Sequence, residues 1–316
     1  MKNNRSYSKQ TVYDIVTQKI IDSLEKGVVP WKKPWLTGHP QNISGRRYTG
    51  INRLLLDLTE YRYPYFLTPN QIQAHGGLIN RREEPHLAVF WKFIEKHETD
   101  IYGDDQIKKI PYLRYYKVYN IEQTNLPLTI AKHYKQSLAD KDEPQNTDGL
   151  NAAERARELV ASFTDIPVIE YNWGDRACYI PAGDKIRLPY EHFFVSPDEF
   201  YSTKFHELVH STGHSKRLNR QGIQDINFGS HEYSKEELIA EIGSCFLCEM
   251  CGMQQHTFEN AAGYIQNWIK ALNNDKRMIV HAAAQAEKAV GYLVGNCEEE
   301  VIETQIPMDS QISVAK

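Results

Sequence analysis

The sequence has no long hydrophobic run and little cysteine. No stretch approaches the roughly 18 consecutive apolar residues that a membrane helix needs, and no apolar segment follows the polar start "MKNNRSYSKQ". Five cysteines, an odd number in 316 residues, argue against a disulfide framework. These absences exclude the membrane and disulfide-rich secreted classes. We expect a soluble protein without a signal peptide, with free thiols in a reducing cytoplasm.

Internal repeats and low-complexity tracts are also lacking, and the net charge of −4 is small. That value conceals an uneven distribution. Residues 1–130 hold 19 Lys and Arg against 13 Asp and Glu, whereas residues 131–316 hold 18 against 28. With 41% hydrophobic residues, the chain is long enough for two globular domains. The opposite charges of the two halves indicate that they meet different partners.

A polar segment without a sustained apolar period, 133–150, separates the two halves. We therefore predict a domain over 1–130, a linker over 131–150 and a second domain over 151–316. The first half mixes predicted helices, capped by Ser8, Asn52 and Thr68, with strands over 87–94 and 112–121. In the second half, short strands precede several helices. This order predicts an α+β fold with two mixed domains.

The segment "KFHELVHSTGH" (204–214) carries the clearest chemical motif. Ser196 is a typical cap upstream of it, which places the segment on a helix. His206 and His210 are then one turn apart, and both imidazoles can reach one metal ion. Glu207 lies beside them and can serve a water molecule without binding the metal. This is the His-Glu-x-x-His arrangement of zinc hydrolases, and the alternative is a polar helix without metal.

A catalytic zinc site needs a third protein ligand and one open position. The metzincin pattern has a histidine where this chain has Lys216, so the following segment "YSKEELIAEIGSCFL" is expected to supply a carboxylate. Ser234 and Glu237 form a predicted capping box, which gives Glu237 a structural task. Glu241 has apolar neighbours, among which an unpaired carboxylate is costly to bury. The predicted ligands of one Zn²⁺ per chain are His206, His210 and Glu241, with Glu237 as the alternative.

Two further side chains are candidates for the same site. His214 lies two turns from His206, and we predict a supporting place beside the pocket in preference to a fourth metal ligand. A transition-state oxyanion needs a hydrogen-bond donor, and His214 and Tyr233 are the candidates for that role.

Cys245, Cys248 and Cys251 follow the spacing C-x-x-C-x-x-C, which is compatible with an iron–sulfur cluster. The run lacks a nearby fourth cysteine, however, and it continues the helix predicted to carry Glu241. We therefore predict free thiols on a small apolar helix face.

Two segments of the N-terminal half combine basic with aromatic residues. Residues 31–53 hold five Lys and Arg and three aromatics, residues 106–120 hold four of each, and neither contains an acid. Cations can follow phosphates while flat rings stack on bases, as single-stranded DNA binding requires. The alternative is that the aromatics are core and the cations are solvated surface. The predicted DNA contacts are Trp31, Lys32, Lys33, Trp35, Arg46, Arg47, Tyr48, Arg53, Arg114, Tyr116 and Lys117.

The segments "PWKKPW", "RRYTGIN", "YFLTPNQIQAHGG", "VFWKF", "YYKVYNIEQ", "HELVHSTGH" and "EELIAEIGSCFL" occur in this order along nearly the whole chain. In this the chain resembles the ArdC-like antirestriction proteins of mobile elements. The resemblance implies an N-terminal single-stranded-DNA-binding domain, similar also to the start of certain plasmid primases, and a C-terminal zincin-like, gluzincin-type metallopeptidase domain. It places the metal motif on His206, Glu207 and His210, with Glu241 matching the helical glutamate. Glu83 and Glu84 depart from the family's basic turn, which weakens a phosphate contact there.

The resemblance also implies that the protein shields DNA that arrives single-stranded by conjugation from host restriction enzymes. We therefore predict an antirestriction protein of a mobile genetic element, with Glu207 as the catalytic base of a zinc metallopeptidase. Its predicted partners are single-stranded DNA and host restriction enzymes or other DNA-bound proteins, but no membrane. Two alternatives remain open: a protease directed to DNA-bound proteins, and a DNA-binding shield whose zinc is structural.

Overall fold

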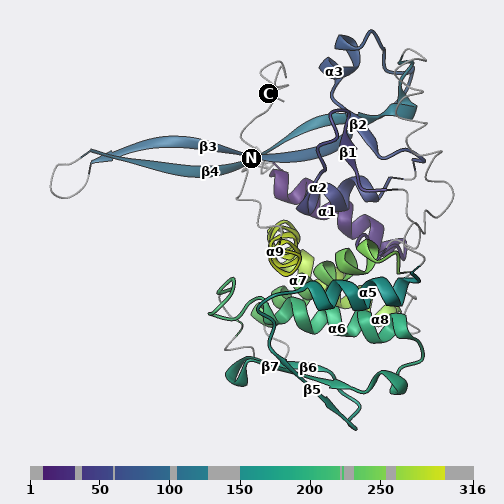
Figure 1. The fold of residues 1–316 in the computed structure, drawn as a ribbon. Coiled ribbons are helices and arrows are strands. Elements are labelled where there is room, and N and C mark those ends of the chain that lie inside the picture. The colour runs from purple at the N-terminus through teal and green to yellow at the C-terminus, as the bar shows by residue number, and fades with distance from the viewer. Residues whose placement is uncertain are drawn as a thin grey trace, which may run out of the picture.

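The computed structural model describes residues 10–32, 38–59, 61–99, 105–126, 150–220, 223, 231–253 and 261–295 of the chain. Helices and strands are mixed in both halves, which confirms the predicted α+β class. Figure 1 shows most helices of both halves gathered between two sheets, one built by the N-terminal half and one by the C-terminal half. Within the described residues, no helix has the length and apolar content that a membrane span requires.

The N-terminal helices begin at capping residues that differ in part from those predicted. Helix α1 (Val12–Glu25) starts after Thr11, which forms a capping box with Asp14, whereas Ser8 lies outside the described residues. Helix α2 (Gly50–Asp57) starts after Thr49, so Asn52 lies inside it and is not its cap. Helix α3 (Pro69–Ala74) is capped by Thr68, as predicted.

The N-terminal sheet has the strand order β1-β2-β4-β3, formed by β1 (Gln41–Asn42), β2 (Tyr65–Leu67), β3 (His86–Thr99) and β4 (Asp105–Asn120). A short 3₁₀ turn (Ile121–Gln123) follows β4. The antiparallel pair β3–β4 runs far beyond the other strands and projects from the body as a long arm (Figure 1). The strands predicted over 87–94 and 112–121 are the inner part of this hairpin.

The C-terminal half begins with α5 (Ala152–Ser162) and a sheet of order β5-β7-β6. Its strands are β5 (Val168–Asn172), β6 (Cys178–Ile180) and β7 (Lys185–Pro189), with β6 antiparallel to β7. A 3₁₀ turn (Pro181–Gly183) joins β6 to β7, and another (Glu191–Phe193) follows β7. The remaining helices are α6 (Pro197–Ser211), α7 (His231–Met250), α8 (Ala261–Asn274) and α9 (Met278–Leu293).

One hydrophobic core continues from the N-terminal half into the C-terminal half. Ile20 of α1 and Leu54 of α2 belong to the same buried cluster as Phe205 of α6 and Ala286 of α9. Helix α2 packs against α9, and α1 packs against α8. The predicted linker lies almost wholly outside the described residues. The two predicted domains therefore share buried apolar surface.

Candidate metal centre and nucleic-acid interface

Helix α6 brings the two motif histidines together. The Ser196 hydroxyl accepts a hydrogen bond from the Glu199 backbone N–H at 3.2 Å, which confirms the predicted cap. One turn of helix separates His206 from His210, and their Nε2 atoms lie 3.0 Å apart. Two imidazole nitrogens that face each other at this distance can hold one proton or one cation between them.

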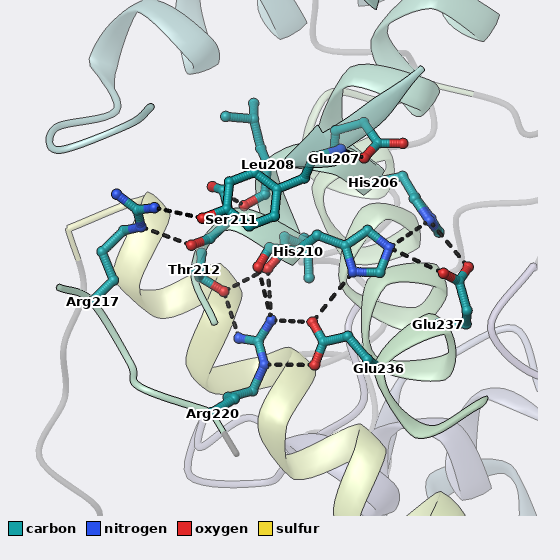
Figure 2. Close-up of polar contacts among 12 residues, drawn as sticks. His206, Glu207, Leu208, His210, Ser211, Thr212, Arg217, Arg220, Glu236 and Glu237 are labelled. Atoms are coloured by element: carbon teal, nitrogen blue, oxygen red, sulfur yellow. Dashed lines mark hydrogen bonds and ion pairs between the residues drawn. The ribbon is translucent and has the colours of Figure 1, made fainter. Parts of the chain in front are cut away.

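A carboxylate from α7 completes the group. Glu237 places one oxygen 3.5 Å from His206 Nε2 and the other 3.5 Å from His210 Nε2, and Figure 2 shows the three side chains pointing toward one another. A tetrahedral ion with bonds of about 2.0–2.1 Å sets its ligand atoms about 3.3 Å apart. The observed separations agree with that value. The three residues form a candidate site for a divalent metal ion.

The predicted ligand Glu241 lies elsewhere, and this part of the prediction is wrong. Its Oε2 accepts a hydrogen bond from the Tyr264 hydroxyl of α8 at 3.1 Å and lies 3.5 Å from Lys32 Nζ. Its side chain is also 19% exposed, so no metal is needed to offset its burial. Apolar neighbours along one helix do not decide burial, because they face different directions.

The error arose from the predicted start of α7. Ser234 lies inside that helix, which extends back to His231, so Ser234 and Glu237 are not a capping box at its start. Glu237 therefore does not cap α7. Its carboxylate faces the two histidines of α6 instead.

The other ring nitrogen of His210 is held by Glu236, the neighbour of Glu237 on α7. Glu236 Oε1 lies 3.3 Å from His210 Nδ1, and both oxygens of Glu236 accept hydrogen bonds from Arg220, at 2.5 and 3.0 Å. Arg220 also donates to the backbone carbonyl of Val209. It donates to the hydroxyl of Thr212 as well (Figure 2). A carboxylate on Nδ1 fixes the ring so that Nε2 faces the candidate metal position.

The group favours positive charge at its centre. Burial opposes a charge on His210, but its hydrogen bonds to Glu236 and Glu237 outweigh burial and raise its pKa to about 10. Burial alone raises the pKa of Glu237. Its hydrogen bonds with His206 and His210 outweigh burial and hold that pKa well below its usual range. A divalent cation can supply the same positive charge and displace the proton.

One carboxylate oxygen of Glu207 is held by strand β6. One of its oxygens, Oε2, accepts a hydrogen bond from the Tyr179 backbone N–H at 2.6 Å, and the residue is 7% exposed. Glu207 does not belong to the candidate metal ligands, as predicted for a residue that serves water. Its second oxygen is the one that can take up a proton.

A part-buried ion pair fixes strand β6 against the end of α6. Asp184, which follows the β6–β7 turn with φ +44°, accepts hydrogen bonds from Arg217 and, at 3.0 Å, from the Tyr179 hydroxyl. Arg217 also donates to the Ser211 carbonyl at 2.7 Å, and its side chain is 2% exposed. The backbone N–H of Tyr179 thus holds Glu207, and the hydroxyl of the same Tyr179 is held by Asp184.

The two candidate oxyanion donors occupy different places. His214 is buried, with Nδ1 accepting a hydrogen bond from the Lys216 backbone N–H at 3.3 Å and lying 3.8 Å from Asp184. It is thus outside the candidate ligand group, as predicted. Burial, followed by the charge and hydrogen bond of Glu237, raises the pKa of Tyr233 to about 12. Tyr233 therefore lies at the candidate metal centre, and His214 lies at the Asp184 ion pair.

Cys245, Cys248 and Cys251 are buried within or just after α7 and belong to the shared core, which agrees with the predicted apolar helix face. Among the residues that the structure describes, the one group with metal-binding spacing is His206, His210 and Glu237.

Several predicted DNA contacts are buried instead. Trp31 is 4% exposed and packs edge-on against Trp268 of α8, while Tyr48 is 6% exposed and packs against Phe66. Arg53 is 5% exposed, pairs with Glu249 of α7 and lies over the Phe246 ring. For these three residues the structure contradicts the prediction and supports the core alternative, since aromatic and basic composition does not reveal burial.

The remaining predicted DNA contacts differ in how far they reach solvent. Arg46, Arg47 and Lys117 are exposed, and Arg114 and Tyr116 are half-buried. Lys32 is largely buried, with 13% of its side chain exposed beside Glu241. Lys33 and Trp35 lie outside the described residues.

Sequence reasoning missed the residues that support the site. For Glu236, the sequence offered one weak indication, because it directly precedes Glu237 on the helix that faces the histidines. Arg220, Asp184 and Arg217 lie in turns or just beyond helix ends, where no periodic pattern marks a partner. Their roles depend on tertiary contacts alone.

Two family models match the chain. The N-terminal domain of anti-restriction factor ArdC matches residues 10–119, and a zincin-like metallopeptidase model matches residues 154–285. The second range includes His206, His210 and Glu237.

Similar proteins cover nearly the whole chain. Two Escherichia coli proteins named DNA primase TraC are 33% and 32% identical to it over 93% of its length, and the chain spans 28% and 20% of theirs. The metal-free crystal structure of the antirestriction protein ArdC from plasmid R388 is 33% identical, with a TM-score of 0.68, over 90% of this chain and 97% of that one. The Mn(II)-bound structure of the same protein is 32% identical, with a TM-score of 0.68, over 92% and 99%.

Proposed function

The chain belongs to the ArdC family of antirestriction proteins, and from this premise we propose that it binds single-stranded DNA and protects incoming DNA from host restriction enzymes. The observation that carries the proposal is the full-length match to the R388 protein, in which both halves are present together. The net positive charge of residues 1–130 supports a DNA-binding role for that half.

We place the DNA contacts at the exposed and half-buried members of the predicted set: Arg46, Arg47, Arg114, Tyr116 and Lys117. Exposed guanidinium and ammonium groups can neutralise phosphates, whereas the buried Trp31, Tyr48 and Arg53 stabilise the fold. Arg46 and Arg47 lie in the turn between β1 and α2, where Ser44 and Gly45 before them are also exposed.

In the C-terminal half, the proposed ligands of one zinc ion per chain are His206, His210 and Glu237. The donor set of two imidazoles and one carboxylate matches that of catalytic zinc sites, which keep one position open. When bound, zinc polarises a carbonyl group and makes a water molecule more acidic. Glu236 and Arg220 hold the His210 ring in the required orientation.

Glu207 is the proposed general base for peptide hydrolysis. The Tyr179 N–H fixes Oε2, so Oε1 is left to take a proton from the attacking water and pass it to the departing amine. Tyr233 lies beside Glu237 and is the proposed donor to the oxyanion, because a phenol hydroxyl is protonated at neutral pH and can donate a hydrogen bond there. His214, at the Asp184 ion pair, is not placed for that role.

Plasmid transfer into restricting and non-restricting recipients tests the proposal. We expect the wild-type protein to increase transfer into the restricting recipient alone, and Arg46→Ala with Arg47→Ala to reduce that gain. Equal transfer with and without the protein contradicts the proposed function.

The same assay separates the two alternatives. If Glu207→Gln protects as well as wild type while retaining metal, the protein is a DNA-binding shield with a structural metal. If Glu207→Gln abolishes both protection and the cleavage of a DNA-bound protein, it is a DNA-directed protease.

A further inference from the structure

The β3–β4 arm carries a cationic and apolar surface on one of its two faces. In an antiparallel hairpin, alternate residues share a face, and directly paired residues lie on the same side. The register pairs Phe90 with Arg114, Lys92 with Tyr112 and Ile94 with Ile110. We call the face formed by these six residues the arm face.

The arm face holds cations without acids. The pair on the body side continues the pattern, with Ala88 opposite Tyr116. At the alternate positions from 88 to 94 and from 110 to 116 there are two cations, Lys92 and Arg114, and no Asp or Glu. Its charge therefore complements a polyanion.

The arm face also exposes apolar surface in one place. Ile94, Ile110 and Tyr112 are 50%, 40% and 48% exposed, and Lys92 beside them is exposed. The Arg114 guanidinium lies 5.6 Å from the centre of the Tyr112 ring. Lysines alone suffice to keep a projecting hairpin soluble, but they do not account for a neighbouring group of exposed isoleucine and tyrosine side chains.

The opposite face serves the fold near the body. Val89 and Leu113 belong to the shared core. The ring centres of Trp91 and Tyr13 lie 6.4 Å apart. Tyr115, which pairs with Val89, is 36% exposed on this face. Near the body this face thus packs mainly on the fold, with Lys117 as an exposed cation opposite Leu87, whereas the arm face beyond Phe90 is directed to solvent.

We infer that the arm face binds single-stranded DNA and carries the proposed contacts of Arg114 and Tyr116 further along the arm, beyond the body of the protein. This inference rests on the proposed function. Cations beside an exposed ring suit a phosphate backbone with unpaired bases, because the ring can stack on a base. A duplex hides its base faces, so the apolar part of the arm face has no equivalent use there.

Fluorescence-anisotropy titrations of the full chain with single-stranded oligonucleotides of increasing length test the inference. Tyr112→Ala is expected to weaken binding of long oligonucleotides by about 5- to 150-fold, the value of one lost stacking contact, while short ones bind unchanged. Lys92→Gln is expected to lower the slope of log affinity against log salt by about 0.7. The matched control Tyr115→Ala, on the opposite face, is expected to bind all lengths like wild type.

Three outcomes overturn the inference. Equal losses for Tyr112→Ala and Tyr115→Ala, with unchanged melting temperatures, show that the arm face has no special role. If Tyr112→Ala and Lys92→Gln bind oligonucleotides of every length with wild-type affinity, the arm face does not bind single-stranded DNA. A larger loss on a blunt duplex than on single strands assigns the arm to a DNA groove instead. If the wild-type chain itself binds no single strand, the DNA part of the proposed function fails as well, and the two failures are thereby distinguished.

Discussion

Glu236 and Glu237 are adjacent on α7 but act on different atoms of His210. Glu237 faces Nε2, where a metal ion is proposed, and Glu236 faces Nδ1, where it orients the ring. Adjacent helical residues point about 100° apart, so one helix can supply both a ligand and its supporting group.

Glu237→Ala should lose the metal, and the matched control Glu241→Ala should keep it. The two glutamates lie one turn apart on α7, but Glu241 bonds to Tyr264 and not to the histidines. Elemental analysis of purified protein gives the metal content of each variant. Full metal content in Glu237→Ala contradicts the proposed ligand set.

Glu236→Gln should weaken metal binding by about 10- to 100-fold without abolishing it, as expected when a group that supports a ligand is changed. Competition with a chromophoric chelator measures the affinity. An unchanged affinity means that Glu236 serves only its buried ion pair with Arg220.

Strand β6 owes its position to interactions that are distant in sequence. Arg217 should therefore matter more than Lys216, although both approach Asp184. Arg217→Ala should lower the free energy of unfolding by about 1–3 kcal/mol, because it removes several part-buried hydrogen bonds and leaves Asp184 without its main partner. Lys216 is 69% exposed, and Lys216→Ala should cost at most about 1 kcal/mol. Chemical denaturation measures both, and equal effects contradict the assigned role of the part-buried pair.

Acid should weaken the same ion pair. Burial alone raises the pKa of Asp184, but hydrogen bonds from Arg217 and Tyr179 outweigh it and lower that pKa. A carboxyl group with a lower pKa in the folded state stabilises the protein above its unfolded pKa, about 4, and this contribution is lost as the pH falls through the folded value. Asp184→Asn should therefore show a smaller loss of stability than wild type when the pH falls below about 4, in melts at graded pH.

Elements with local signals could be predicted from the sequence. The helix with His206 and His210, its Ser196 cap and the Thr68 cap of α3 are confirmed, because caps and i, i+4 spacing involve neighbouring residues. The third carboxylate could not be chosen, because that choice required the start of α7 and its packing against α6. Trp31 and Arg53 could not be separated from Arg46 and Arg47, because burial against α7 and α8 leaves no mark in composition.

At the scale of the whole molecule, the shared core predicts that the two halves unfold together. Trp31→Ala should destabilise the entire protein by about 3–5 kcal/mol, because it removes a buried aromatic that packs on Trp268 of the C-terminal half. Calorimetry should show one transition that shifts as a unit. Two separate transitions, with the C-terminal one unmoved, contradict this expectation.

The continuous core also limits how such a protein can be recombined. A chimera that exchanges residues 1–130 for those of a relative must match α1 and α2 to the α8 and α9 surfaces that they cover. Without that match, Ile20 and Leu54 meet foreign side chains, and the Arg53–Glu249 pair loses one partner. Chimeras of relatives are therefore expected to fold when the residues of α1 and α2 and those of α8 and α9 that contact each other come from the same parent. The peptide segment that connects the two halves is the lesser constraint.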